Sequence, residues 1–175
     1  MKTGSWSLAG LTSRTEAAIE AVLDREGGYV DHPADRGGPT NFGITISTLS
    51  EWLGRPAAAN DVKAISRHVA IAIYVDRYVK QPSLDRIDDD ALFRYMVDAS
   101  AHHGPRKAVK MLQKVVGATV DGILGPMTLA TVNRLVASDI LAALRKERAL
   151  FMGKIVKNDP SQAAFLVGWL DRALG

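Results

Sequence analysis

The chain has 175 residues, which is enough for one compact domain with a hydrophobic core or for a domain with a small appended subdomain. Its 22 Lys and Arg against 19 Asp and Glu give a formal net charge of +3, which suits polyanionic surroundings such as nucleic acid, anionic lipid or bacterial cell wall without choosing among them. The absence of cysteine excludes disulfides, thiolate metal sites and cysteine nucleophiles.

The N-terminal stretch MKTGSWSLAGLTSRTE lacks the apolar run that a secretory signal peptide needs. No later segment approaches the ~18 consecutive apolar residues of a membrane span. We therefore expect a protein made in the cytoplasm without such a signal, and no stable membrane insertion.

The first predicted element is a helix over residues 14–26. A capping box in Ser13-Arg14-Thr15-Glu16 begins it, and the pair Gly27-Gly28 ends it. Residues 29–45 combine Pro, Gly and Asp with short apolar runs, which predicts turns and a small irregular β-hairpin.

From residue 47 onward the pattern is helical almost to the end. Turn and cap residues separate the predicted helices, which cover residues 47–53, 61–80, 89–103, 106–116, 126–136, 139–157 and 160–173. The predicted fold is therefore mainly α: a helical bundle with one small irregular β-hairpin near the N-terminus.

One acidic residue of the first helix lies on its apolar face. Ile19, Val22, Leu23 and Glu26 follow the spacing i, i+3, i+4, i+7, so the Glu26 carboxyl is directed toward the interior or its edge. The negative end of the helix dipole and partial desolvation both favour the protonated carboxyl there. Such a Glu is suited to donate a proton near neutral pH.

Further polar side chains follow Glu26 in the turn-rich segment, among them Asp31, Asp35, Thr40 and Asn41. A second carboxylate is thus available beside the helix end. Glycoside hydrolysis uses this pairing, in which one carboxyl protonates the leaving oxygen and the other acts as nucleophile, base or electrostatic stabiliser.

The segment EGGYVDHPADRGGPTNFGIT, which begins at Glu26, resembles the signature of glycoside hydrolase family 108. This family comprises lysozyme-like N-acetylmuramidases of phage endolysins and secretion-associated muramidases. The resemblance implies a lysozyme-like fold and cleavage of the β-1,4 bond between N-acetylmuramic acid and N-acetylglucosamine, with Glu26 as the catalytic acid. It implies action on the cell wall or periplasm and leaves the phage and secretion roles open.

One departure from the family pattern concerns the second carboxylate. Where the pattern commonly has Asp-Pro, this chain has His32-Pro33, so Asp31 is not assumed to replace the missing Asp. Asp35, nine residues after Glu26, is the better candidate, because phage lysozymes of similar layout have the same Glu-to-Asp spacing.

The resemblance also indicates residues that contact substrate. Thr40 and Asn41 precede Phe42-Gly43-Ile44-Thr45, which resembles the strand that brings a Thr or Asn under the cleft of those lysozymes. Aromatic rings stack on sugars, although core packing is the commoner fate of residues such as Trp52. The predicted substrate-binding residues are Tyr29, Thr40, Asn41 and Thr45.

No metal and no cofactor is expected. The four histidines, His32, His68, His102 and His103, do not have metal-site spacing, and solvated or capping roles are the default. In the predicted helix 139–157, which is basic and amphipathic, an apolar core stripe with a solvated basic face is favoured over contact with anionic lipid.

The second half contains LQKVVGATVDGILGPMTLATVNRL, residues 112–135, a helix-loop-helix unit. It resembles the small peptidoglycan-binding-like subdomain of the same muramidase family. We expect a catalytic region over residues 1–87 and this subdomain over 88–175, packed on it or forming one compact domain with it. Whether the subdomain binds glycan or only supports the catalytic half is left open.

The main prediction is a monomeric muramidase that acts on peptidoglycan glycan strands. We also consider three alternatives. A lytic transglycosylase also uses one Glu but closes an anhydro ring. A non-catalytic wall-binding or secretion-associated protein would keep only the fold. A nucleic-acid binder is not expected, because it rests on the pI of about 9.3 alone and no DNA- or RNA-binding motif is recognised.

Overall fold

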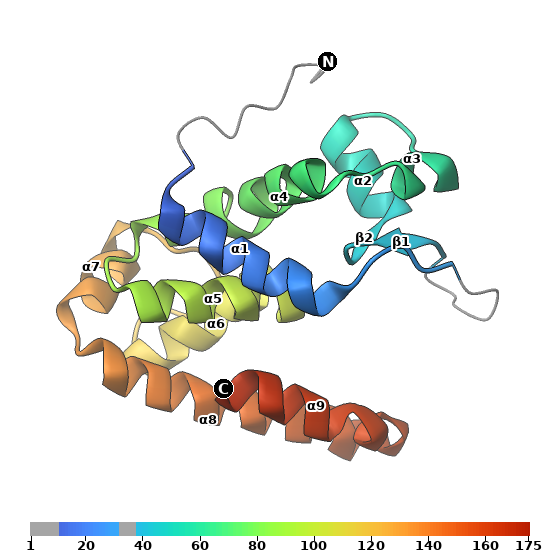
Figure 1. Ribbon diagram of the computed structural model, residues 1–175. Coiled ribbons are helices and arrows are strands. Elements are labelled where there is room, and N and C mark those ends of the chain that lie inside the picture. Colours follow the sequence, from blue (N-terminus) through green and yellow to red (C-terminus); the bar gives the residue numbers. More distant parts are fainter. Residues whose placement is uncertain (1–10, 32–37) are drawn as a thin grey trace. The chain divides into compact units, whose positions relative to one another are not determined.

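The computed structural model describes residues 11–31 and 38–175. Within these residues helices dominate, and the only sheet is one antiparallel pair of short strands (Figure 1). The expected fold, mainly helical with one small β-hairpin near the N-terminus, is confirmed. The chain divides between Gln81 and Pro82 into two compact units.

The elements of the first unit are α1 (Ser13–Glu26), β1 (Thr40–Asn41), β2 (Ile44–Thr45), α2 (Ile46–Leu53), α3 (Ala59–Lys63), α4 (Arg67–Val75) and the π-helical segment η1 (Asp76–Lys80). Those of the second unit are the 3₁₀ turn η2 (Leu84–Arg86), α5 (Asp90–His103), α6 (Pro105–Val116), α7 (Pro126–Arg134), α8 (Ala137–Asn158), the 3₁₀ turn η3 (Pro160–Gln162) and α9 (Ala163–Leu174).

Helix α1 presents one apolar face to the core of the first unit. The N-cap is Thr12 rather than the expected Ser13, because the Thr12 hydroxyl accepts a hydrogen bond from the Thr15 amide (3.4 Å). The buried apolar side chains are Ala18, Ile19, Val22 and Leu23. The predicted stripe is therefore the face that the helix buries.

The core face of α1 packs against α4. On the exposed edge of this contact Arg67 of α4 forms ion pairs with Glu20 and Asp24 of α1. Exposed ion pairs contribute at most about 1 kcal/mol each, so apolar packing is the main source of cohesion between the two helices.

Two short strands form the hairpin that follows. Thr40 pairs with Thr45, Asn41 pairs with Ile44, and a two-residue turn joins them. Thr40 also exchanges two backbone hydrogen bonds with Val30, each 2.8 Å long. The hairpin is thereby tied to the chain just after α1.

The single helix predicted over residues 61–80 is wrong. Helix α3 ends at Lys63 and α4 begins at Arg67, because Ser66 is an N-cap whose hydroxyl accepts a hydrogen bond from the Val69 amide (3.3 Å). Apolar spacing continues across this break, so periodicity alone did not reveal it.

Helix α4 then continues into η1, where the winding widens. The Gln81 amide donates to the carbonyl of Asp76, five residues earlier, over 2.9 Å. A π-turn of this kind inserts one residue into a helix and rotates the side chains that follow it.

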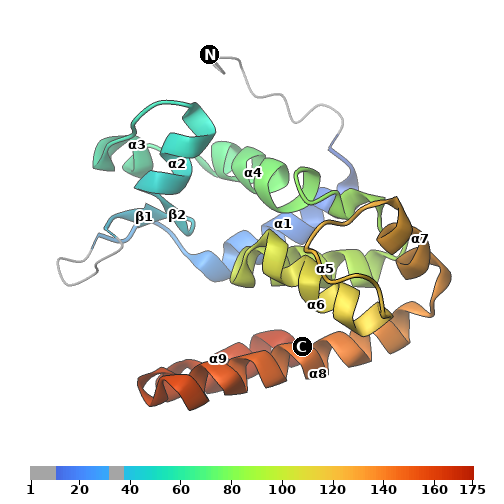
Figure 2. The same cartoon turned by 180° about the vertical axis from the view of Figure 1, so that it is seen from behind.

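In the second unit, helices α5, α6 and α8 pack together and α9 lies antiparallel beside α8 (Figures 1 and 2). The predicted breaks at Gly104-Pro105 and at Asn158-Asp159-Pro160 are confirmed. Among the described residues no single helix has both the length and the hydropathy of a membrane span.

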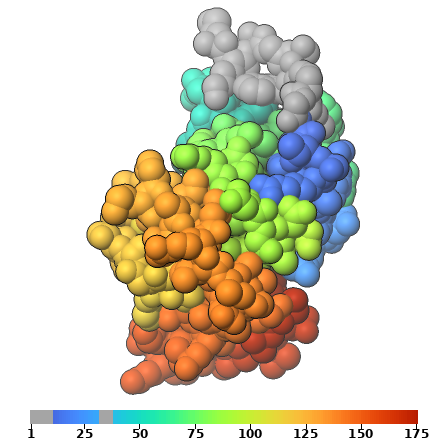
Figure 3. Space-filling view, turned by 90° about the vertical axis from the view of Figure 1, so that its left-hand side faces the viewer, coloured from blue at the N-terminus to red at the C-terminus, as the bar shows by residue number. Residues whose placement is uncertain are grey.

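The helix-loop-helix unit predicted over residues 112–135 corresponds to the end of α6, a loop and α7, which adjoin on the surface in Figure 3. The buried Gln113 holds the loop: its Nε2 donates to Asp121 Oδ1 (2.7 Å) and to the Ile123 carbonyl (2.9 Å), and its Oε1 accepts from the Gly122 amide (2.8 Å). The hydrogen bond from Gln113 and then that from the Ile123 amide lower the pKa of Asp121.

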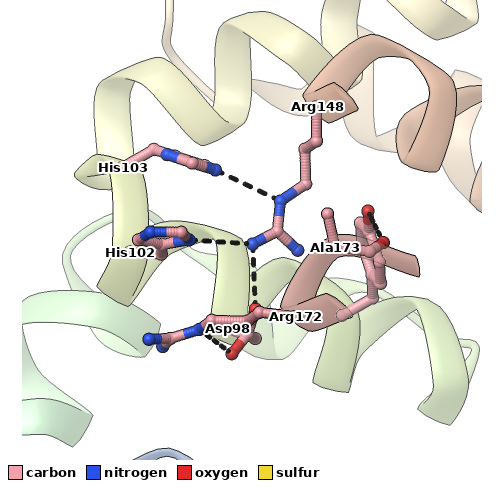
Figure 4. A network of polar contacts seen from close by, with 7 residues as sticks. Asp98, His102, His103, Arg148, Arg172 and Ala173 are labelled. Carbon is pink, nitrogen blue, oxygen red and sulfur yellow. Dashed lines mark hydrogen bonds and ion pairs between the residues drawn. The ribbon is translucent and has the colours of Figure 1, made fainter. Parts of the chain in front are cut away.

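A buried arginine links α8 to α5 (Figure 4). Arg148 is completely buried on the core stripe of α8, and one terminal nitrogen donates to Asp98 Oδ2 (3.0 Å). Its Nε donates to His103 Nε2 (3.2 Å), and His102 Nδ1 accepts a further bond (3.3 Å). Asp98 also pairs with Arg172 of α9 (2.8 Å).

This network corrects two expectations. Arg148 is not on a solvated face, because four-residue spacing places it on the buried side of α8 with Leu144 and Met152. His102 and His103 are not solvated caps, since their stacked rings accept hydrogen bonds from Arg148. Burial first and nearby positive charge second lower the pKa of His102 to about 4, and burial and His102 lower that of His103 to about 3.

We expect the free energy of unfolding to fall as the pH falls from about 6.5 to about 4. The folded state keeps both histidines neutral there, whereas the unfolded chain protonates them near pH 6.5, so acid favours unfolding. Thermal melts of the wild type and of a His102→Gln, His103→Gln double variant measure this effect. The double variant should lose stability less steeply with acid.

A matched control is His68→Gln, which removes an exposed histidine of α4. It should retain the acid dependence of the wild type. An equally steep loss of stability in the double variant would contradict the assignment to His102 and His103.

Candidate active site

Glu26 is the last residue of α1 and is half-buried. It follows the buried residues Val22 and Leu23 on the same helical face, as expected. Gly27 ends the helix with a φ of +73°. The Glu26 side chain therefore lies at the edge of the first unit's core.

The backbone of the hairpin turn lies directly against the Glu26 side chain. A Cβ atom at Gly43 would lie 2.9 Å from Glu26 Oε2 and 2.9 Å from the Tyr74 hydroxyl oxygen. Gly43 also has a φ of +71°, which disfavours any other residue. The close approach and the left-handed conformation both require glycine at this position.

Tyr74 fixes the turn in place. Its hydroxyl donates a hydrogen bond to the carbonyl of Phe42 (2.8 Å). Phe42 has a φ of +52°, so both central residues of the turn are left-handed, as in a type I′ hairpin. The buried Tyr74 thus anchors a conformation that costs a non-glycine residue about 1–2 kcal/mol.

A second tyrosine lies one turn further along, within η1. The rings of Tyr74 and Tyr78 are 4.9 Å apart between centroids. Burial raises the pKa of Tyr78, the Arg77 guanidinium opposes this, and the negative charges of Glu26 and Glu51 raise it further. The Tyr78 hydroxyl is therefore protonated at neutral pH and lies in the field of Glu26.

The predicted strand residues have defined structural tasks. Asn41 is buried, and its Nδ2 donates to the carbonyls of Val62 (3.1 Å) and Ile65 (3.2 Å), which ties the hairpin to α3 and the turn after it. The Thr45 hydroxyl caps α2 by accepting from the Thr48 amide (3.1 Å). The half-buried Thr40 pairs through its backbone with the strand partners described above.

The remaining predicted residues follow the helix end. Tyr29 is 37% exposed, and its hydroxyl donates to Asp31 Oδ2 (3.1 Å). The Nζ atom of Lys63 lies 5.6 Å from the Tyr29 ring centroid. Desolvation and the Asp31 carboxylate raise the pKa of Tyr29. Asp35 lies outside the described residues.

Sequence reasoning did not identify Tyr74 and Tyr78. Both fall in a segment that reads as a continuous apolar helix, where tyrosines four residues apart are ordinary. Their position beside Glu26 depends on the contact between α1 and α4, which the sequence pattern does not show. Trp52, for which stacking on sugar and core packing were both open, is buried in α2.

Comparison with known proteins gives three findings. A family model described as glycosyl hydrolase 108 matches residues 19–104, and a model described as a predicted peptidoglycan domain matches residues 107–174. The solved structure of SagA from Brucella abortus is 37% identical with a TM-score of 0.75, and the match covers 91% of this chain and 93% of that one. No curated protein matches the chain.

We expect Gly43→Ala to impair both stability and activity on peptidoglycan. The left-handed φ alone costs about 1–2 kcal/mol, and the added methyl group would displace either the Glu26 carboxylate or the Tyr74 hydroxyl. Thermal unfolding and clearing of wall suspensions measure the two effects.

The control is Gly117→Ala, at a glycine with the same φ of +71° and no atom within 4 Å of the added Cβ. This variant should lose stability because of the backbone strain but keep its activity. Full activity in Gly43→Ala would show that the close approach is not needed to position Glu26.

Proposed function

The chain belongs to the glycosyl hydrolase 108 family, and we propose that it hydrolyses the β-1,4 bond between N-acetylmuramic acid and N-acetylglucosamine, with Glu26 as the general acid. A glycoside hydrolase family and a peptidoglycan domain in one chain make it a peptidoglycan hydrolase. The observation that supports Glu26 as the acid is its half-buried carboxylate, which packs against Gly43 and lies close to the tyrosine hydroxyls.

In this mechanism the protonated Glu26 donates its proton to the oxygen of the glycosidic bond as that bond breaks. Positive charge then develops on the muramic acid ring. A second carboxylate either bonds to the anomeric carbon or activates the attacking water. We assign this second role to Asp35, on the sequence spacing given above.

The hairpin and the residues after α1 supply substrate contacts in this proposal. Tyr29 and Thr40 are the preferred candidates, because the amide nitrogen of Asn41 and the hydroxyl of Thr45 already serve structural hydrogen bonds. The glycan strands of the cell wall are the partner, and the wall is the place of action. The peptidoglycan domain supports the same assignment.

We expect Glu26→Gln to reduce wall lysis by at least about a hundredfold, because the amide keeps the shape but cannot donate the proton. Turbidity clearing of purified sacculi measures the rate, and circular dichroism checks the fold. The matched control, Glu16→Gln, makes the same change at an exposed position in the first turn of α1 and should lyse like the wild type.

The products of the same digestion decide which bond is cut and how. Hydrolysis by a muramidase leaves reducing N-acetylmuramic acid ends, which borohydride reduction and mass spectrometry identify. Products with 1,6-anhydro ends would instead assign the chain to the lytic transglycosylases. Lysis by Glu26→Gln at the wild-type rate would reject Glu26 as the acid.

We expect Asp35→Asn to lower the lysis rate more than Asp31→Asn does. The second substitution is the matched control, since Asp31 is exposed and accepts the hydrogen bond of Tyr29. A loss in Asp35→Asn comparable to that of Glu26→Gln indicates a reacting carboxylate, and a loss below about tenfold indicates electrostatic support. The reverse order of the two variants would transfer the role to Asp31.

A further inference from the structure

The first unit contains a cavity of about 620 Å³ that does not include Glu26. The C-terminal half of α2 and the turn after it line one side, and the end of α4 and η1 line the other. This volume lies within the range of about 300–1,000 Å³ that is usual for small-molecule sites. The lining residues used below are Glu51, Trp52, Arg55, Asp76, Arg77 and Gln81.

The polar part of the lining carries equal numbers of opposite charges. Arg77 forms an ion pair with Glu51 (2.7 Å), and Gln81 Nε2 donates to Asp76 Oδ2 (3.2 Å). Together with Arg55 these groups sum to no net charge, and they offer donors and acceptors side by side. Such a lining suits a neutral ligand rich in hydroxyl and amide groups better than a phosphate or a cation.

The apolar part comes from Trp52, Leu53 and Ile73. Trp52 is 9% exposed and lines the cavity from α2. An aromatic edge beside paired charged groups matches the two kinds of surface on a pyranose, apolar C–H faces and polar hydroxyl groups.

The cavity is connected to Glu26 through η1. The Tyr78 hydroxyl interacts with the Arg77 guanidinium, and the charges of Glu26 and Glu51 both act on it. On one side of the α4–η1 segment Tyr74 contacts the hairpin turn at Glu26, and on the other Ile73 and Arg77 line the cavity. The cavity residue Arg77 is therefore linked to Glu26 through Tyr78 within the same unit.

We propose that this cavity is a subsite for an N-acetylglucosamine residue of the glycan strand, beyond the bond that is cut. The inference rests on the proposed function. A peptidoglycan strand alternates two sugars, and N-acetylglucosamine is the one without a lactyl carboxylate. The neutral lining favours that sugar, with Arg77 and Glu51 bonding hydroxyl groups and Trp52 contacting the ring.

The test uses tri-N-acetylchitotriose, which contains only N-acetylglucosamine. Isothermal titration measures its binding to the full chain with Glu26→Gln in place, and to the same chain carrying Arg77→Met or Gln81→Ala as well. We expect each added substitution to weaken binding at least fivefold. Gln81 is exposed, so Gln81→Ala tests the subsite even where loss of the Arg77 ion pair disturbs folding.

The matched control is Arg67→Met, which removes an arginine of α4 that also pairs with carboxylates but lies outside the cavity. It should bind chitotriose like the parent chain. In the otherwise wild-type enzyme, Gln81→Ala should raise the KM for solubilised glycan strands and leave kcat nearly unchanged, since it removes ground-state binding.

Chitotriose binding that is absent from the parent chain, or unchanged by both Arg77→Met and Gln81→Ala, would overturn the subsite. Failure of the proposed function has a different signature: wall lysis by Glu26→Gln at the wild-type rate. The two failures are therefore distinguishable, because one is a binding result in the cavity variants and the other is a rate in the acid variant.

Discussion

The contact between the Gly43 backbone and the Glu26 carboxylate is the constraint on which the first unit's candidate active site depends. It brings together a helix end, a hairpin turn and a tyrosine of α4. Each of these is held by something else: α1 by its apolar face, the turn by the Tyr74 hydrogen bond, and the hairpin by Asn41 on the carbonyls after α3. The polar residues around Glu26 thus act largely by fixing the backbone that surrounds it.

Helical spacing explains how one segment, α4 with η1, serves two surfaces. Tyr74 and Tyr78 lie near the Glu26 side chain, whereas Ile73, Asp76 and Arg77 line the cavity. Tyr74 and Tyr78 are four residues apart, and Ile73, Asp76 and Arg77 follow the spacing i, i+3, i+4, so each set lies on one face of the segment.

Much of this arrangement could be predicted from local patterns. Prolines and glycines mark several of the helix ends, and the spacing from Ile19 to Glu26 predicted the face of α1 correctly. The two failures differ in origin. The break at Ser66 has a local cause, the N-cap hydrogen bond from the Val69 amide, whereas the burial of Arg148 depends on Asp98, far away in the sequence. Periodicity contains no information on such partners.

The family boundary and the structural boundary do not coincide, and α5 lies between them. The glycosyl hydrolase match extends to residue 104, while the second compact unit begins at Pro82. Helix α5 buries Phe93, Met96 and Val97 in a unit built with α6 and α8, and its Asp98 balances the buried Arg148. Removal of a partner from a buried ion pair costs about 3–5 kcal/mol. The helix that completes the hydrolase match thus packs against helices of the peptidoglycan domain, and both family matches extend into the second compact unit.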